Sequence, residues 1–155
     1  MYHKYISPIG VITYQIKEGF LVSLAIDDLE VDVENNETSK KIDKTLEMYF
    51  RNKIDTFDIP IAFERGTPFQ KQVWNELLKI PYGESRSYQD IANLIQNPKA
   101  LRAVGQACKK NPIGIVVPCH RVIGKDGSLT GYSGKNYTHI KKILVDHEKN
   151  NEEIA

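Results

Sequence analysis

The sequence has few of the residues that build disulfide scaffolds and metal sites. It contains only two cysteines, Cys108 and Cys119, and neither a CxxC nor an HExxH motif. Two cysteines are too few for a disulfide framework, and the four histidines do not lie at zinc-site spacing from them. The pattern predicts two thiols in a reducing compartment, without a structural metal and without a cofactor.

Long hydrophobic runs are absent as well. No apolar stretch approaches the ~20 residues that a membrane-spanning helix needs. The first ten residues also lack the basic and apolar segments of a secretion signal. Hydrophobic residues make up 41% and charged residues 26% of the 155 residues, which is typical of a globular protein. We therefore expect a cytoplasmic protein without membrane contacts, a monomer by default, with one large or two small domains.

Charge is distributed unevenly along the chain, although the net charge is only +1. Residues 1–62 carry 7 Lys and Arg against 11 Asp and Glu, whereas residues 63–155 carry 14 against 9. Residues 86–142 contain ten basic residues and only two acidic ones, Asp90 and Asp126. This segregation favours a basic half that contacts a polyanion, although a solvated basic face would give the same pattern.

The first part of the chain, residues 1–62, predicts a small α/β scaffold domain. Residues 2–16 are rich in aromatic and β-branched side chains, and residues 20–26 alternate at period two, which indicates strands. The acidic stretch 27–39 predicts a loop, and the apolar spacing in residues 40–50 predicts a helix. Residues 54–66 are interpreted as the connection to the next domain.

The second part, residues 63–155, predicts a mostly helical domain. Thr67 before Pro68 is typical of a helix start, and Ser87 with Asp90 forms a weak capping box for a second helix. Residues 99–110 predict a third, basic helix, and the second and third together have the outline of a helix-turn-helix. The positions expected to face inward are Phe69, Val73, Trp74, Leu77, Leu78, Ile91, Leu94, Ile95, Leu101, Val104 and Cys108.

Cys119 is the strongest candidate for a chemical role. It follows residues 113–117, which predict a short buried strand, and His120 and Arg121 stand beside it. Positive neighbours lower the pKa of a thiol and favour the nucleophilic thiolate. Glu148 lies on a predicted amphipathic C-terminal helix and could fix the tautomer of His120, which would give a Cys-His-Glu relay. The alternative is an inert buried cysteine and an exposed carboxylate, and Cys108 is interpreted as a packing residue.

At these residues the chain resembles a known family. The run from Asn111 to Gly124 reads NPIGIVVPCHRVIG and is similar to the signature of the O6-alkylguanine-DNA alkyltransferases, the methylated-DNA–protein-cysteine methyltransferases. The similarity covers residues 69–148, with a weaker match at residues 7–10. Further matching motifs are Gly83, Ser87-Tyr88, Asn97-Pro98, Arg102-Ala103-Val104-Gly105, Gly131-Tyr132-Ser133-Gly134, Ile143-Leu144 and His147-Glu148.

The resemblance implies an α+β fold in which a ribonuclease H-like unit precedes a winged-helix or helix-turn-helix-like DNA-binding domain. It implies repair of DNA by direct reversal, with the alkyl group of O6-alkylguanine, and of O4-methylthymine, transferred from a flipped base to Cys119. His120 and Glu148 would form the relay of that cysteine, and Asn111 would brace the turn before it. The product would be a thioether that no group in the sequence cleaves, so each molecule would react once.

The resemblance also implies how DNA is bound. Arg102 would enter the base stack where the target base leaves, and Tyr88 would crowd the flanking phosphate and bond the guanine. Val122, Tyr132 and Ser133 would line the guanine pocket. Phosphate contacts are expected from Ser87, Lys99, Lys109 and Lys110. Zinc ligands of some relatives are missing here, and the stretch between Tyr132 and Glu148 is about two residues longer than usual.

Two other functions fit part of the pattern. A cysteine hydrolase built on Cys119, His120 and Glu148 would turn over on an ester or amide, but side chains adjacent in an extended segment point apart. A DNA-binding module without chemistry would keep its function when Cys119 is replaced. The alkyltransferase hypothesis predicts instead that this replacement abolishes transfer and leaves DNA binding intact.

Overall fold

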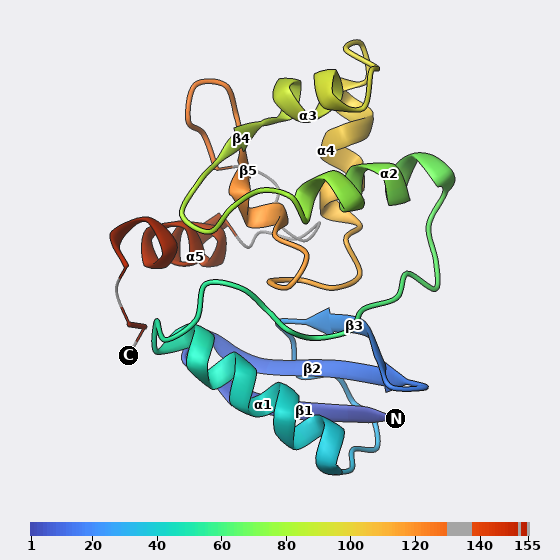
Figure 1. Ribbon diagram of the computed structural model, residues 1–155, viewed down its shortest axis with the longest axis vertical. Helices are drawn as coiled ribbons and strands as arrows, with labels where there is room; N and C mark the ends of the chain where they lie inside the picture. The colour runs from blue at the N-terminus through green and yellow to red at the C-terminus, as the bar shows by residue number, and fades with distance from the viewer. Residues whose placement is uncertain (130–137, 152, 155) are drawn as a thin grey trace.

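The computed structural model describes residues 1–129, 138–151, 153 and 154. In Figure 1 the elements form two groups, a sheet with one helix and, at the opposite end, a helical cluster. The first group contains β1 (Tyr2–Ser7), β2 (Gly10–Lys17), β3 (Phe20–Ala25) and α1 (Glu37–Phe50). The second contains α2 (Pro68–Leu77), β4 (Arg86–Ser87), α3 (Tyr88–Leu94), α4 (Leu101–Lys109), the 3-10 turn η1 (Cys119–Arg121), β5 (Val122–Ile123) and α5 (Thr138–Asn150).

This arrangement confirms the α+β class. The ribonuclease H-like and winged-helix kinships, and a domain boundary at residue 62, stay predictions. Within the described residues, no helix has the length and apolar character that crossing a bilayer requires.

The N-terminal sheet is an antiparallel meander in the order β1-β2-β3. Its buried face, which includes Ile12 and Tyr14, packs with Ile42 and Leu46 of α1 in one hydrophobic core. The helix α1 begins earlier than the sequence predicted, because Asn36 and Ser39 form a reciprocal capping box. The predicted loop 27–39 therefore ends at the cap, since the amide oxygen of Asn36 satisfies a backbone N–H of the first turn.

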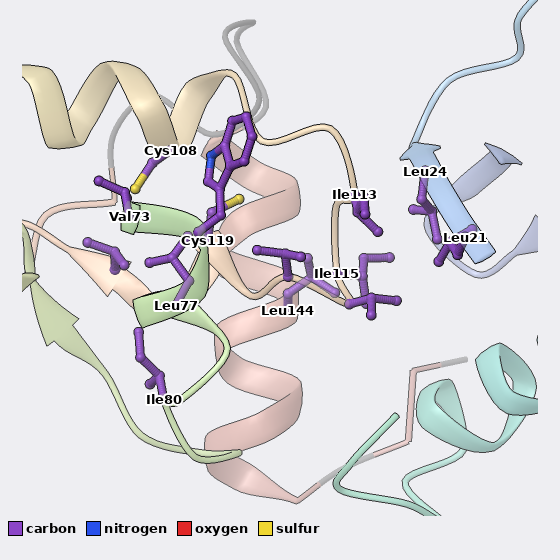
Figure 2. Packing of buried hydrophobic residues seen from close by; sticks show 14 of the residues in the cluster. Leu21, Leu24, Val73, Leu77, Ile80, Cys108, Ile113, Ile115, Cys119 and Leu144 are labelled. Atoms are coloured by element: carbon purple, nitrogen blue, oxygen red, sulfur yellow. The ribbon is translucent and has the colours of Figure 1, made fainter. Parts of the chain in front are cut away.

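The free edge of β3 is covered by two segments from elsewhere in the chain. Backbone bonds join Leu21 to Pro60 and Ala62, in the connection between the two groups. Further along the same strand, Leu24 bonds to Pro112 and Gly114 at 2.9 and 3.0 Å, and Figure 2 shows Ile113 opposite Leu24. Pairing of an otherwise open edge fixes the segment before Cys119 against the N-terminal sheet.

The helices α2 and α3 of the second group begin where the sequence predicted. Thr67 caps α2 with Pro68 at the first position, and Ser87 caps α3 reciprocally with Asp90, so both predicted caps are confirmed. The inward positions are mostly right, but Leu78, Leu94 and Leu101 are wrong, because each is between 41% and 55% exposed. All three lie at or next to helix ends, where the buried stripe stops.

The predicted strand at residues 113–117 is wrong, because this buried segment turns instead of extending. The Val117 N–H donates to the Ile113 carbonyl at 3.0 Å, and Ile115 has a positive φ of 68°. Apolar content alone gave the strand prediction, but the side chain of Asn111 bonds to both ends of the segment and closes it into a turn. Cys119 leaves this turn into the core beside Leu77 and Leu144, as Figure 2 shows.

Candidate active site

The turn η1 holds three consecutive functional side chains in the interior. The Cys119 N–H donates to the Val117 carbonyl at 2.8 Å, and the Arg121 N–H donates to the Pro118 carbonyl at 3.0 Å. Cys119, His120 and Arg121 are all buried, and Cys119 is only 3% exposed. Because the backbone turns here, the Cys119 thiol meets Asn111 while His120 and Arg121 both meet α5.

Asn111 joins the turn to the thiol. Its Nδ2 donates to the Val117 carbonyl at 2.8 Å and to Cys119 Sγ at 3.2 Å. Its Oδ1 accepts the Ile113 N–H at 3.0 Å. One amide group therefore fixes both the shape of the turn and the position of the sulfur.

Glu148 is the centre of a buried polar cluster. Its Oε2 accepts from His120 Nε2 at 2.6 Å and from Arg121 Nη2 at 3.1 Å, and its Oε1 accepts from Arg121 Nε at 2.7 Å. A fourth donor, the hydroxyl of Tyr49 on α1, lies 2.5 Å from Oε2. The side chain is buried, so the alternative of an exposed carboxylate is wrong.

The pKa values in this cluster follow from burial and from the partners. Burial alone would raise the pKa of Glu148, but His120 and the guanidinium of Arg121 outweigh it and hold the pKa well below its usual range. Burial lowers the pKa of His120 despite the opposite effect of Glu148. At neutral pH the relay is therefore a neutral imidazole bonded to a carboxylate, and Arg121 compensates the carboxylate charge.

The expected cause of thiol activation is wrong. Burial raises the pKa of Cys119, and the effects that oppose it are, in order, the hydrogen bond from Asn111, the charge of Lys141 on α5 and a backbone hydrogen bond. His120 is neutral and Arg121 is engaged by Glu148, so neither neighbour acts as the sequence suggested. Cys108 is buried too, and burial raises its pKa strongly, as expected for a packing residue.

The helical group also contains a pocket of about 440 Å³, a volume within the usual range for ligand sites. It lies between α3, α4 and the loop after β5, and Tyr88 and Arg102 both line it. Cys119 is not among its lining residues. Lys141 connects the pocket with the thiol, because its Nζ lies 3.3 Å from the Tyr88 hydroxyl and its charge acts on Cys119. The remaining lining residues are Gln89, Leu101, Gly105, Gln106, Lys109, Gly124 and Lys125.

Comparisons with known proteins assign the chain to a family. Residues 68–150 match the family described as 6-O-methylguanine DNA methyltransferase, DNA binding domain. A methylated-DNA–protein-cysteine methyltransferase of Methanosarcina mazei is 52% identical over 119 residues, 77% of this chain and 73% of that protein. The chain belongs to the methylated-DNA–protein-cysteine methyltransferase family. It is an enzyme that repairs DNA by direct reversal.

Two mycobacterial relatives extend the similarity beyond the helical part. The methyltransferase of Mycobacterium bovis is 44% identical over 152 residues, which is 92% of this chain and 88% of that protein. The crystal structure of Mycobacterium tuberculosis OGT in complex with DNA has a TM-score of 0.88 and 41% identity, and it covers 97% of this chain and 94% of that one. The similarity therefore includes the N-terminal sheet.

The DNA-side residues predicted for the methyltransferase fall into three groups. The first group contains four exposed basic residues on or beside α4, namely Lys99, Arg102, Lys109 and Lys110. A second groove of about 580 Å³, against α2, is lined by three of them, Lys99, Arg102 and Lys110. Ser87 caps α3, and Val122 is buried in β5, paired with β4. The predicted pocket residues Tyr132 and Ser133 lie outside the described residues.

Three residues to which the sequence analysis gave no role in the relay contact or act on it in the structure. Tyr49 was interpreted only as an apolar position of a helix, and nothing in its spacing indicated the partner ninety-nine residues away. Arg121 was taken as a neighbour of the thiol. Lys141 had a usable signal, because it stands two helical turns before Glu148 and so shares its face of α5. The described residues hold no cluster of three or more His, Cys, Asp or Glu suited to a metal ion.

Proposed function

We propose that the methyltransferase takes the alkyl group from O6-alkylguanine, and from O4-methylthymine, in double-stranded DNA and transfers it to Cys119. The observation that carries the proposal is a buried thiol fixed by Asn111, in the same turn as the His120–Glu148 pair, and linked through Lys141 to a pocket lined by Tyr88 and Arg102. In the reaction a sulfur–carbon bond forms, the bond between that carbon and the base oxygen breaks, and the base leaves with one added proton.

His120 is the proposed acceptor of the thiol proton. Its Nε2 is bonded to Glu148, so its Nδ1 is the nitrogen that remains for the thiol proton, and within the described residues that buried atom has no hydrogen-bond partner. The carboxylate of Glu148 stabilises the imidazolium that forms. Lys141, whose charge acts on the sulfur, stabilises the thiolate. Tyr88, at the pocket wall, is the proposed donor to the departing base.

Positioning carries most of the rate in this scheme. A lower thiol pKa raises the thiolate fraction but reduces intrinsic nucleophilicity, so the two effects nearly cancel. Oriented attack can contribute about 7–11 kcal/mol, so the fixed position of the sulfur lowers the barrier more than the thiol pKa does. The bonds from Asn111 to the sulfur and to the turn are consistent with such a rigid arrangement.

The proposed substrate must leave the duplex before it can reach the thiol, at a cost of a few kcal/mol. We assign α3 and α4 as a helix-turn-helix, within a winged-helix-like domain of residues 63–155, that places α4 in the minor groove. Arg102 would fill the gap left by the flipped base. Val122, Tyr132 and Ser133 would line the base pocket. Sequence-independent phosphate contacts would come from Ser87, Lys99, Lys109 and Lys110.

A pair of cysteine variants tests the proposal. Cys119→Ser should leave O6-methylguanine in a duplex oligonucleotide intact while binding unmodified duplex with unchanged Kd. The matched control is Cys108→Ser, which changes the other buried thiol and should retain transfer. Loss of O6-methylguanine is followed by chromatography of the digested oligonucleotide. Transfer by Cys119→Ser, or equal loss in both variants, would contradict the assignment of Cys119.

A further inference from the structure

We propose that Tyr49 of the N-terminal α1 is a positioning residue of the reaction, which acts by holding the carboxylate of Glu148 for His120. The inference rests on the proposed role of the His120–Glu148 pair. It assigns to the N-terminal group of elements a part in alkyl transfer, through a single hydroxyl that crosses from α1 to α5.

The hydrogen bonds on Glu148 show why one hydroxyl matters. The oxygen that accepts from Tyr49, Oε2, is the same oxygen that accepts from His120 at 2.6 Å. The guanidinium of Arg121 spans both oxygens and fixes the plane of the carboxylate from one side. Tyr49 supplies the remaining strong bond on Oε2, so its loss changes the charge and the freedom of the atom that orients the imidazole.

The chemistry of Tyr49 favours this role over packing. Its ring centroid lies 5.0 Å from that of Phe57, tilted by 31°, and 5.3 Å from that of Phe50, edge-on, contacts that a phenylalanine would also make. The hydroxyl is buried, and a buried hydroxyl is costly unless it is bonded. Burial, followed by the charge of Glu148, raises the pKa of Tyr49 well above its usual value. The group therefore remains a donor across the whole neutral range.

The contact between α1 and α5 holds Tyr49 in place. His147 Nε2 bonds to the Tyr49 carbonyl at 2.8 Å, so the residue beside Glu148 fixes the backbone of its hydroxyl donor. Asn52 Nδ2 donates to the Asn151 carbonyl at 2.7 Å, and the Tyr82 hydroxyl donates to Asn52 Oδ1 at 2.7 Å. In Figure 1 the C-terminal end of α1 lies beside α5 and the C-terminus of the chain.

Titratable and charged groups face the pair from several elements. Arg121 of η1 and Lys141 of α5 act on His120 and lower its pKa. Tyr49 of α1 donates to Glu148, whereas Tyr82, in the loop after α2, only has its own pKa raised by the Glu148 charge and donates its hydroxyl to Asn52 instead. Removal of the Tyr49 hydroxyl leaves more negative charge on Oε2. Because that charge favours the imidazolium, the pKa of His120 in the variant should rise.

The test is Tyr49→Phe, with Tyr82→Phe as the matched control. Both substitutions remove one hydroxyl from the same interface, but only the first removes a bond to Glu148. Single-turnover methyl transfer from O6-methylguanine duplex should fall about tenfold in Tyr49→Phe and stay within twofold of wild type in Tyr82→Phe. The rising limb of the pH–rate profile should move to higher pH in Tyr49→Phe only. Affinity for unmodified duplex should not change in either variant.

A second background separates a positioning effect from general loosening. In His120→Gln the relay base is gone while the Glu148–Arg121 pair is kept, so adding Tyr49→Phe should cost no further rate. Equal losses in both tyrosine variants, an unmoved pH–rate profile, or an additive loss in the His120→Gln background would overturn the inference. A His120→Gln protein that transfers at the wild-type rate would instead refute the relay itself.

Discussion

Asn111→Ala should show how much of the site depends on one amide group. The substitution removes the only backbone or side-chain partner found for the Ile113 N–H in the described residues, and this N–H is buried. An orphaned buried donor costs about 1–3 kcal/mol. The Val117 carbonyl loses the hydrogen bond from Asn111 but still accepts the Cys119 N–H. This second loss therefore costs less, about 0.5–1.5 kcal/mol. The free energy of unfolding should therefore fall by about 1.5–4.5 kcal/mol.

The same substitution should slow transfer through the sulfur. The Asn111 amide lies 3.2 Å from Sγ and lowers the pKa of Cys119, so the pKa rises further when the amide is removed. A hydrogen bond to a charged group contributes about 1.5–3 kcal/mol. A thiolate of higher pKa is also a stronger nucleophile. With a Brønsted slope of about 0.45, this gain offsets somewhat less than half of the lost stabilisation. The remainder predicts a transfer rate about 4- to 15-fold lower at pH 7, with partial recovery at higher pH.

Urea unfolding and single-turnover transfer measure the two effects. Asn75→Ala, at an exposed position of α2, is the control and should change the free energy of unfolding by no more than about 0.5 kcal/mol. The reasoning is refuted if Asn111→Ala unfolds at the wild-type urea concentration. It is equally refuted if the transfer deficit does not shrink as the pH is raised.

The DNA-side residues and the pKa shifts give two further predictions. Arg102→Ala should slow transfer about tenfold on duplex and much less on single-stranded oligonucleotide, because only the duplex must be unstacked; equal losses in single-turnover assays would contradict this. The melting temperature should fall as the pH drops from 7 towards 5, because unfolded His120 binds a proton near pH 6.5 that the folded residue, with its lowered pKa, does not. Below pH ~4.3 protonation of unfolded Glu148 should add to the loss, and His120→Gln should flatten the upper part of the curve.

Local signals in the sequence predicted the elements well. Caps at Thr67 and Ser87 were visible because they depend on residues three apart, and the period-two pattern of β3 was read correctly. The start of α1 was misplaced, because Asn36 and Ser39 lie in a polar stretch without an apolar stripe. The turn at residues 113–117 was missed, since a short run of apolar residues is equally compatible with a buried strand and a buried turn.

The candidate site was predictable where its motif is contiguous. Cys119 and His120 are neighbours in sequence, Glu148 was suggested by the pattern of the C-terminal helix, and the family resemblance supplied Asn111. The contacts that set the chemistry are long-range instead. Tyr49 reaches Glu148 only because α1 packs against the end of α5, and Lys141 is brought near Cys119 by the fold. The direction of the thiol pKa shift was wrong for the same reason, since burial of Cys119 depends on the whole core.

Intact-mass measurement of the methyltransferase tests the central claim most directly. The protein is incubated with a large excess of duplex containing O6-methylguanine, and its mass, the modified peptide and the number of repaired sites are determined together. One added methyl group per molecule, located on Cys119, with one site repaired for each protein consumed, is the predicted result. Repair of many sites per molecule, or a Cys119 that stays unmodified while methyl groups disappear from the DNA, would contradict it.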